Sequence, residues 1–382
     1  MQRVYLDNAA TTPMAPEVIA EMTRVMSTCF GNPSSVHGYG REAKAEIERS
    51  RRTVARLLNC QPGEIVFTSG GTEADNMALV CSVRDLGVRR IITSGIEHHA
   101  VTHTVESVAH QGVTIAEVDL LADGHVDIAH LTTMLEDRSY GPTLVSLMHA
   151  NNEIGNLTDI AAVAHLCRNH GAYFHSDTVQ TMGHYRMDLG ALGVHFVTCS
   201  AHKFHGPKGI GFLYMSSDVR INPILQGGAQ ERNMRGGTEN IYGIVGLAKA
   251  LDMCHHDMEG HQRHVQGLKD HMIARLRQEL PGVGFNGDAD GRSLYTVLNV
   301  DLPATPIAEM MLFNLDIMGV AASGGSACSS GSQKGSHVLA HLQRDHSRPA
   351  VRFSFSRYTT LDEVNYAIDC VVKLYAKAPA TA

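Results

Sequence analysis

The chain contains no tryptophan, and its aromatic residues make up only 5% of 382 positions. Proteins that stack nucleic-acid bases need several exposed rings, so this scarcity argues against a base-stacking platform. A basic excess is missing as well, because 32 Lys and Arg residues stand against 39 Asp and Glu, a formal charge of −7. Nucleic-acid and anionic-membrane binders carry a basic surface, so we expect neither nucleic acid nor membrane among the partners.

Long apolar runs are also missing. A membrane-spanning helix needs about 20 apolar residues in a row, and no such run occurs. The opening segment Met1–Asn8 lacks the apolar core of a signal peptide. The eight cysteines form no CxxC pair, which indicates free thiols in a reducing compartment rather than a disulfide framework. We therefore expect a cytoplasmic protein.

Short β-branched runs alternate with helical patterns over about residues 60 to 215. These runs are almost continuously apolar, as strands buried on both faces are. They stand at residues 64–67, 90–93, 113–115, 144–148, 173–174, 196–198 and 210–214. The alternation predicts an α/β fold with a mainly parallel central sheet flanked by helices.

The pattern changes in the last third of the chain. Helical spacing over 265–280 is followed by strand-like runs at 296–300 and 350–354 and by an amphipathic helix over about 362–375. This indicates a smaller α+β domain, against which the first dozen residues pack. We place the large domain at residues 15–255 and the small domain at 1–14 together with 256–382.

Polar clusters follow five of the predicted strands. They are residues 69–73, 97–100, 149–153, 175–180 and 200–203. In an open α/β sheet the ligand crevice lies just outside the carboxyl ends of the strands. One pocket would then collect a glycine-rich phosphate cradle, an imidazole, an amide, a carboxylate and a lysine.

The segment 323–332 is made of small, polar and glycine residues. It predicts a mobile loop over about 323–336, with Cys328 inside it. A thiol that attacks a substrate and then carries a product away needs such freedom. Cys167, Cys199 and Cys370 instead lie in apolar patterns and fit buried structural thiols.

Six segments, in this order along the chain, resemble the cysteine desulfurases of the NifS/IscS type. They are Tyr5–Pro13, Ser69–Glu73, Glu97–His98, His149–Gly155, Ser200–Lys203 and Gly325–Cys328. The resemblance extends from residue 4 to about residue 375. It implies a fold type I, class V pyridoxal-phosphate enzyme that converts L-cysteine to L-alanine and leaves a persulfide on Cys328.

The resemblance also implies a cofactor site. Pyridoxal 5'-phosphate would be bound as a Schiff base to Lys203, with Asp177 on its pyridine nitrogen. His98 would stack on the ring and move protons, as a residue that titrates near neutrality can. The remaining cofactor contacts would be Gly71, Thr72, Ser200 and His202 on the phosphate, Asn152 and Gln180 on the ring oxygen, and Thr238 from the second subunit of a homodimer.

Substrate contacts follow from the same resemblance. Arg352 would hold the α-carboxylate of cysteine with a bidentate fork, and Arg357 competes for this role. Asn32 and Asn152 would add further contacts. The sulfur would pass to an acceptor protein, either an iron–sulfur scaffold or a sulfur carrier for tRNA modification. We expect no metal, because the histidines at 255, 256, 261 and 264 better fit a solvated helix face.

Two other functions stay open at this point. Selenocysteine lyases and class V aminotransferases share the lysine and phosphate clusters, although an aminotransferase has no need of a loop cysteine. A non-catalytic scaffold on the same fold would be expected to have lost Lys203 or Cys328, and the chain has both.

Overall fold

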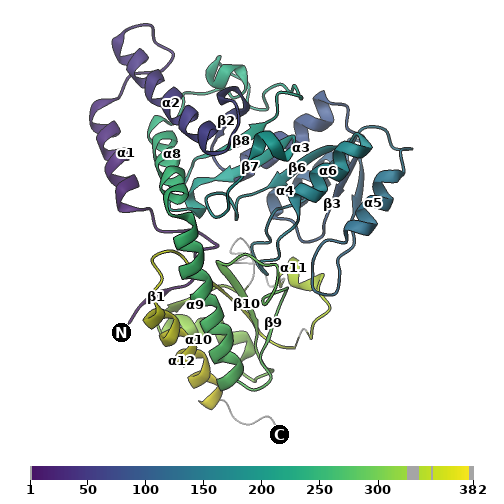
Figure 1. The fold of residues 1–382 in the computed structure, drawn as a ribbon, viewed down its shortest axis with the longest axis vertical. Helices are drawn as coiled ribbons and strands as arrows, with labels where there is room; N and C mark the ends of the chain where they lie inside the picture. The colour runs from purple at the N-terminus through teal and green to yellow at the C-terminus, as the bar shows by residue number, and fades with distance from the viewer. Residues whose placement is uncertain (1, 325–334, 346, 378–382) are drawn as a thin grey trace.

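A computed structural model describes residues 2–324, 335–345 and 347–377. Figure 1 shows a large part that holds the main sheet and, below it, a smaller part built from both ends of the chain. In the described ranges no helix is long and apolar enough to cross a membrane.

The main sheet has seven strands in the order β2-β8-β7-β6-β5-β3-β4. They are β2 (Ile65–Thr68), β3 (Arg90–Thr93), β4 (Thr114–Glu117), β5 (Thr143–Ser146), β6 (Tyr173–Asp177), β7 (Phe196–Ser200) and β8 (Gly211–Met215). Only β8 runs antiparallel to its neighbours β2 and β7. The connection from β7 to β8 is too short for the crossover that a parallel pair needs. The predicted mainly parallel sheet is confirmed.

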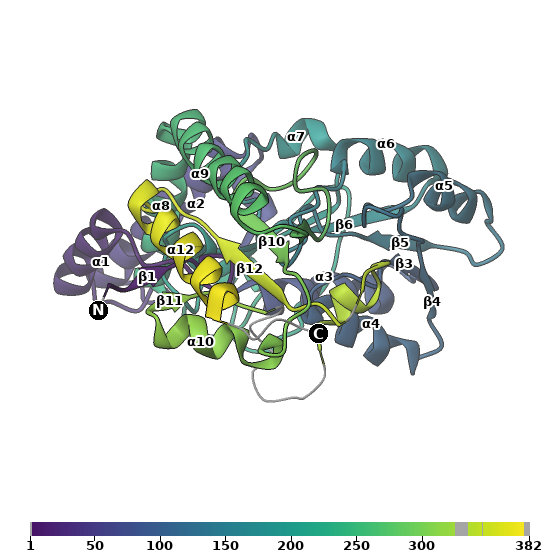
Figure 2. The ribbon, with the colours of Figure 1, turned by 90° about the horizontal axis from the view of Figure 1, so that it is seen from below.

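Helices cover both faces of this sheet. They are α1 (Pro16–Thr28), α2 (Gly38–Leu57), α3 (Gly71–Asp85), α4 (His99–Ala109), α5 (Ile128–Glu136), α6 (Ile160–His170), α7 (Leu189–Leu192) and α8 (Ile241–His256). Figure 2 shows α5, α6 and α7 on one side and α3 and α4 on the other. Because both faces are covered, strands such as β5 and β7 are buried at every position, which explains their unbroken apolar runs.

The smaller part has its own apolar core. Strand β1 (Val4–Tyr5) pairs in parallel with β11 (Val320–Ala321), so the N-terminus joins this part. A second sheet has the order β12 (Ala350–Ser354), β10 (Val297–Asp301), β9 (Gly284–Phe285). Its helices are α9 (Met258–Glu279), α10 (Met311–Ile317), α11 (His337–Ala340) and α12 (Leu361–Lys377). Buried residues such as Leu6, Leu276 and Phe353 form a cluster separate from the main core, and the domain boundaries drawn from the sequence stay a prediction.

Helix α9 begins at Met258, earlier than the predicted start at residue 265. Polar residues in its first turns hide the helical period there.

The interpretation of the nearby histidines as a solvated face is wrong for His255, which is buried, with its Nδ1 3.1 Å from the Leu251 carbonyl oxygen. His264 has its Nε2 2.9 Å from the Thr359 carbonyl oxygen.

Candidate active site

A cavity of about 220 Å³ lies at the carboxyl ends of the parallel strands. Its walls come from all five polar clusters that follow predicted strands, together with the N-terminal segment and β12. The site residues predicted from the sequence that line it are Gly71, Thr72, His98, Asn152, Asp177, Gln180, Ser200, His202, Lys203 and Arg352. The fold thus brings together groups that lie up to 281 positions apart, from 71 to 352, in the sequence.

Lys203 ends a short 3-10 turn, Ala201–Lys203, directly after β7. Its Nζ donates hydrogen bonds to the carbonyl oxygens of Ala9 at 2.7 Å and Ala10 at 2.9 Å. The Thr12 hydroxyl donates to the His202 carbonyl oxygen at 2.9 Å. The N-terminal segment and the strand end therefore hold each other, and together they direct the lysine into the cavity.

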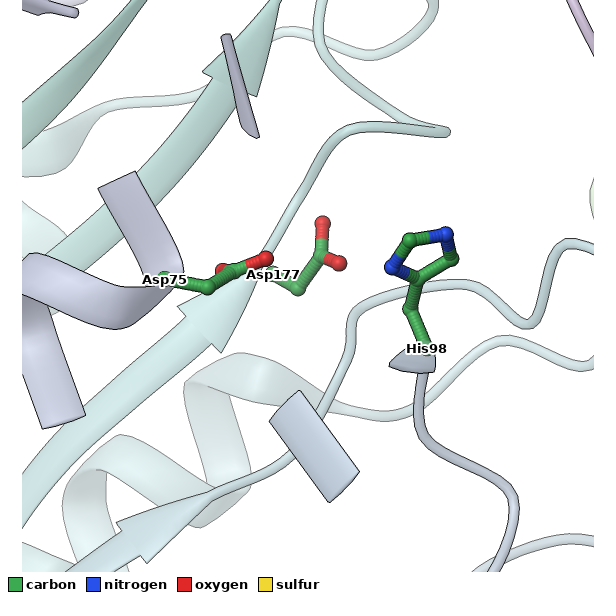
Figure 3. Close-up of side chains that lie close together, drawn as sticks. All are labelled: Asp75, His98 and Asp177. Atoms are coloured by element: carbon green, nitrogen blue, oxygen red, sulfur yellow. The ribbon is translucent and has the colours of Figure 1, made fainter. Parts of the chain in front are cut away.

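Asp177 lines the cavity at the end of β6, and Figure 3 shows its carboxyl group between Asp75 and His98. Its Oδ1 accepts a hydrogen bond from the Val179 backbone N–H at 2.8 Å. Burial, and then the charge of nearby Asp75, raise the pKa of this carboxyl to about 7. Gln180, three residues on, donates to the Ala9 carbonyl oxygen at 3.1 Å. A positively charged partner next to the Asp177 carboxylate would be strongly favoured, because it would offset the cost of burying that charge.

His98 is the N-cap of α4 and points into the cavity from the side opposite Asp75 (Figure 3). Its Nδ1 accepts a hydrogen bond from the Ala100 N–H at 3.1 Å. This bond assigns the proton of the neutral ring to Nε2. Burial and the charge of Lys203 lower the pKa of His98 to about 4, so the imidazole is neutral at physiological pH and carries its proton on Nε2.

The wall of the cavity formed by the start of α3 suits an anion. Helix α3 begins at Gly71, and no side chain caps its first turn. Gly70 has φ +153°, and a Cβ on Gly71 would lie 2.8 Å from a Val179 methyl carbon, so this turn requires glycine. The free N–H groups of a helix start attract phosphate. Ser200 and His202 line the same cavity.

Arg352 reaches the cavity from the centre of β12 and is only 1% exposed. Its guanidinium donates to the Asn152 carbonyl oxygen and to Asp7 Oδ1, each at 2.8 Å. Arg352 Nε is buried, and no described residue accepts a hydrogen bond from it. Arg357 instead donates to Cys254 Sγ at 2.8 Å, so the geometry favours Arg352 as the carboxylate ligand.

Two predicted residues do not reach this cavity within one chain. Thr238 is exposed and lines a smaller cavity of about 70 Å³. Its loop is anchored by Glu231, whose carboxylate accepts two hydrogen bonds of 2.8 Å from buried Arg51. Asn32 is exposed, and its Oδ1 accepts from the Ser34 N–H at 2.9 Å. Thr238 was predicted to act from a second subunit, and that contact stays a prediction. Asn32 was predicted to contact the substrate, but it does not line the cavity.

Cys328 lies outside the described residues, but the flanks of its segment are attached beside the cavity. The backbones of Ser323 and Arg352 exchange hydrogen bonds of 3.1 and 2.6 Å. After the segment, the Ser336 hydroxyl donates to Glu153, next to cavity-lining Asn152.

The seven described cysteines are free thiols, buried or half-buried, and none of them lines the cavity. Burial raises their pKa values, as at Cys60 and Cys167, each to about 12.

Three side chains of the cavity also lie at a spacing that a metal ion could use. Asp75, His98 and Asp177 each offer one ligand atom, and these atoms lie within 4.8 Å of one another. Lys203 brings a positive charge to the same cavity, close enough to lower the pKa values of both His98 and Asp177. Lys203 would repel a cation, so the charge in this cavity disfavours a metal ion between these three side chains.

Comparisons with known proteins agree with this geometry. Residues 4–366 match the family model for aminotransferase class-V. The chain belongs to this family. It is 38% identical over 380 residues to the cysteine desulfurase IscS of Dictyoglomus turgidum, covering 98% of this chain and 95% of that protein. It is 41% identical to the putative cysteine desulfurase IscS 1 of Bacillus subtilis strain 168, covering 96% and 97%.

A solved structure of a NifS-like protein superposes with a TM-score of 0.90 at 32% sequence identity, covering 98% of this chain and all of that one. The chain is therefore a class-V protein of the cysteine desulfurase group, which uses pyridoxal 5'-phosphate. The residues of the cavity fit this cofactor, because the uncapped α3 start suits its phosphate, Lys203 its aldehyde and Asp177 its ring nitrogen. The predicted family and fold class are confirmed.

Two buried acidic residues, Asp75 in the cavity and Glu97 next to His98, were given no role from the sequence. Asp75 lies four positions after Gly71 on α3, so both face the cavity, and that helical spacing was the available signal. Glu97 is buried, and its carboxyl group accepts from the Ser94 hydroxyl at 2.7 Å and the Met148 N–H at 2.9 Å. Burial raises the pKa of Glu97 to about 8. Glu97 thus ties the end of β3 to the end of β5.

Buried neutral imidazoles should make the protein sensitive to acid. Burial lowers the pKa values of six histidines to about 4, namely His98, His149, His175, His184, His202 and His205. A base with a lowered folded-state pKa binds fewer protons folded than unfolded, so stability is present above the unfolded value and is lost as the pH falls. We expect loss between about pH 6.5 and about pH 4, at about 1.4 kcal/mol per pH unit for each imidazole.

Denaturant unfolding at several pH values measures this loss. The raised carboxyls Asp75, Asp177 and Glu97 act in the opposite sense, but they are three groups against six. His149→Gln, which keeps the side-chain size at a position outside the active-site cavity, should reduce the slope by about one proton. A stability that stays level or rises on acidification would contradict the prediction.

Proposed function

We propose that the chain is a pyridoxal-phosphate-dependent cysteine desulfurase. It converts L-cysteine to L-alanine and transfers the sulfur to Cys328 as a persulfide. The Cys328 thiolate attacks the substrate sulfur, the Cβ–Sγ bond breaks, Cβ takes up a proton, and Cys328 keeps the sulfur as S–SH. The supporting observation is that Lys203, Asp177 and Arg352 line one cavity, beside which the flanks of the Cys328 segment are attached.

Each side chain has a part that follows from its chemistry. Lys203 would hold the cofactor through its aldehyde, and Arg352, which lines the same cavity, would bind the substrate carboxylate. Neutral His98 would give up and take back a proton at Nε2, because Nδ1 already accepts the Ala100 N–H. When bound, the cofactor supplies an electron sink, which lets the α-proton leave and polarises the Cβ–Sγ bond.

The assembly around this site is part of the proposal. Thr238 is exposed on a loop held by the buried Arg51–Glu231 pair, so it is available to a neighbouring subunit. We infer a homodimer in which Thr238 contacts the phosphate in the partner's cavity. The persulfide then passes to an acceptor protein, an iron–sulfur scaffold or a tRNA-modifying sulfur carrier, in a cytoplasmic location.

Purified protein loaded with pyridoxal 5'-phosphate should release one alanine for each sulfur when L-cysteine and a thiol acceptor are added. Alanine is measured by chromatography and sulfur as sulfide. Parallel reactions with selenocysteine, and with alanine plus pyruvate, separate the related activities. Faster turnover of selenocysteine would indicate a lyase, and amino transfer to pyruvate an aminotransferase. A protein that stays colourless with the cofactor and produces no alanine would contradict the proposal.

A further inference from the structure

Behind Asp177 the cavity holds a second carboxyl group that the proposed reaction does not use. Asp75 is 1% exposed and lines the cavity from α3. Figure 3 shows the Asp75 and Asp177 carboxyl groups side by side, with His98 beyond them. One oxygen of each lies within 4.8 Å of the other. Two buried like charges at this separation repel strongly, so the pair favours a shared proton.

The surroundings of Asp75 provide only partial compensation. Thr198 gives it one hydrogen bond. Asp75 Oδ1 lies 3.3 Å from His175 Nε2 but accepts no hydrogen bond within the described residues. His175 is fully buried, with Nδ1 2.9 Å from the Ser146 hydroxyl and Nε2 3.1 Å from the Thr198 hydroxyl. These neutral partners orient the carboxyl group without cancelling its charge.

Of the two described cations that line the cavity, Lys203 lowers the pKa of Asp177, and Arg352 is paired with Asp7. Burial raises the pKa of Asp75 to about 7, as it does for Asp177. The titratable groups that face the pair from the surrounding elements are Glu97, His98, His175, Cys199 and Lys203. Glu97 adds a further acidic group, and the two imidazoles are neutral.

We propose that Asp75 acts through Asp177 as a positioning residue for the cofactor ring. In the cofactor-free cavity the two carboxyl groups hold one proton between them, with a net charge of −1. A pyridine nitrogen that enters takes this proton and becomes positive, and the pair is left with two negative charges. The inference rests on the proposed cofactor, but the state of the free pair can be tested without it.

The first experiment uses the cofactor-free protein. An acid with a raised folded-state pKa binds more protons folded than unfolded, so its contribution to stability is lost as the pH rises from about 4 to about 7. Asp75→Asn should remove this loss. Compared with the wild type, the variant should therefore gain stability at about pH 8 relative to its stability at about pH 5. Asp177→Asn should have the same effect, and it replaces Asp75→Asn if that variant does not fold. Thermal unfolding across this pH range measures both.

A control on the same helix separates charge from packing. Ser82 is buried on α3, and its hydroxyl donates to the Ala78 carbonyl oxygen at 2.6 Å. Ser82→Ala should shift the unfolding temperature equally at every pH. If Asp75→Asn behaves in the same pH-independent way, Asp75 is a structural residue and the inference is overturned.

The second experiment measures cofactor binding rather than turnover. Asp75→Asn should weaken binding of pyridoxal 5'-phosphate by about tenfold, the equivalent of one pKa unit. Its affinity for the deaza analogue, which has carbon in place of the ring nitrogen, should change by less than about twofold. Equal losses for both ligands would overturn the inference. A wild-type protein that binds neither ligand would contradict the proposed function while the first experiment still reports on the pair.

Discussion

Replacing Lys203 with alanine should abolish desulfurase activity, with a loss of about a thousandfold or more, as for other groups that bond covalently in catalysis. Lys203 Nζ is directed into the cavity by the carbonyl oxygens of Ala9 and Ala10. Among the described residues that line this cavity it is the only amine. The variant should also lose the visible absorption of the bound cofactor, which a spectrum of the purified protein measures directly.

The control for this variant is Lys208→Ala. Lys208 lies five residues further on, is exposed, and does not line the cavity, so its loss should leave colour and activity near those of the wild type. Circular dichroism checks that Lys203→Ala is folded. If Lys203→Ala keeps both the colour and the alanine production of the wild type, the covalent attachment is on another residue and the site must be reassigned.

The strand-end groups of the site were predictable because they depend on one general rule. Once the alternating runs indicated a mainly parallel sheet, the polar residues after each strand had to meet at its carboxyl edge. Asp177, His98 and Lys203 all follow this rule, and all three line the cavity. The antiparallel strand β8 does not change this rule. Its two neighbours β2 and β7 run in the same direction, so their carboxyl ends still lie on the same side of the sheet.

The contributions from elsewhere in the chain were harder to predict. Arg352 stands between the buried residues Val351 and Phe353 on a strand of the smaller part, and its orientation depends on Asp7, 345 positions away. Asp75 looks like an ordinary helix residue until α3 is known to face the cavity. Asn32 and Thr238 are exposed and do not line the cavity, so the rule for strand ends gives them no place in it.

Cys328→Ser should stop sulfur transfer while leaving cofactor binding intact, because the described residues that would hold the cofactor, among them Lys203 and Asp177, are unchanged. A hydroxyl is a far weaker nucleophile than a thiolate at neutral pH, so persulfide formation should fall about a thousandfold or more. Mass spectrometry of the wild type after L-cysteine should find one extra sulfur atom on the peptide that contains Cys328. The variant should show none, but L-cysteine should still change its visible spectrum.

Cys60→Ser provides the matched control. Cys60 is the most accessible of the described cysteines, yet burial raises its pKa to about 12, so little thiolate exists there at neutral pH. Its loss should leave sulfur transfer at the wild-type rate. The reverse pattern, with transfer undiminished in Cys328→Ser, would remove the persulfide step. The cavity would then fit an enzyme that releases sulfur or transfers amino groups without a protein thiol, because the cofactor residues do not depend on Cys328.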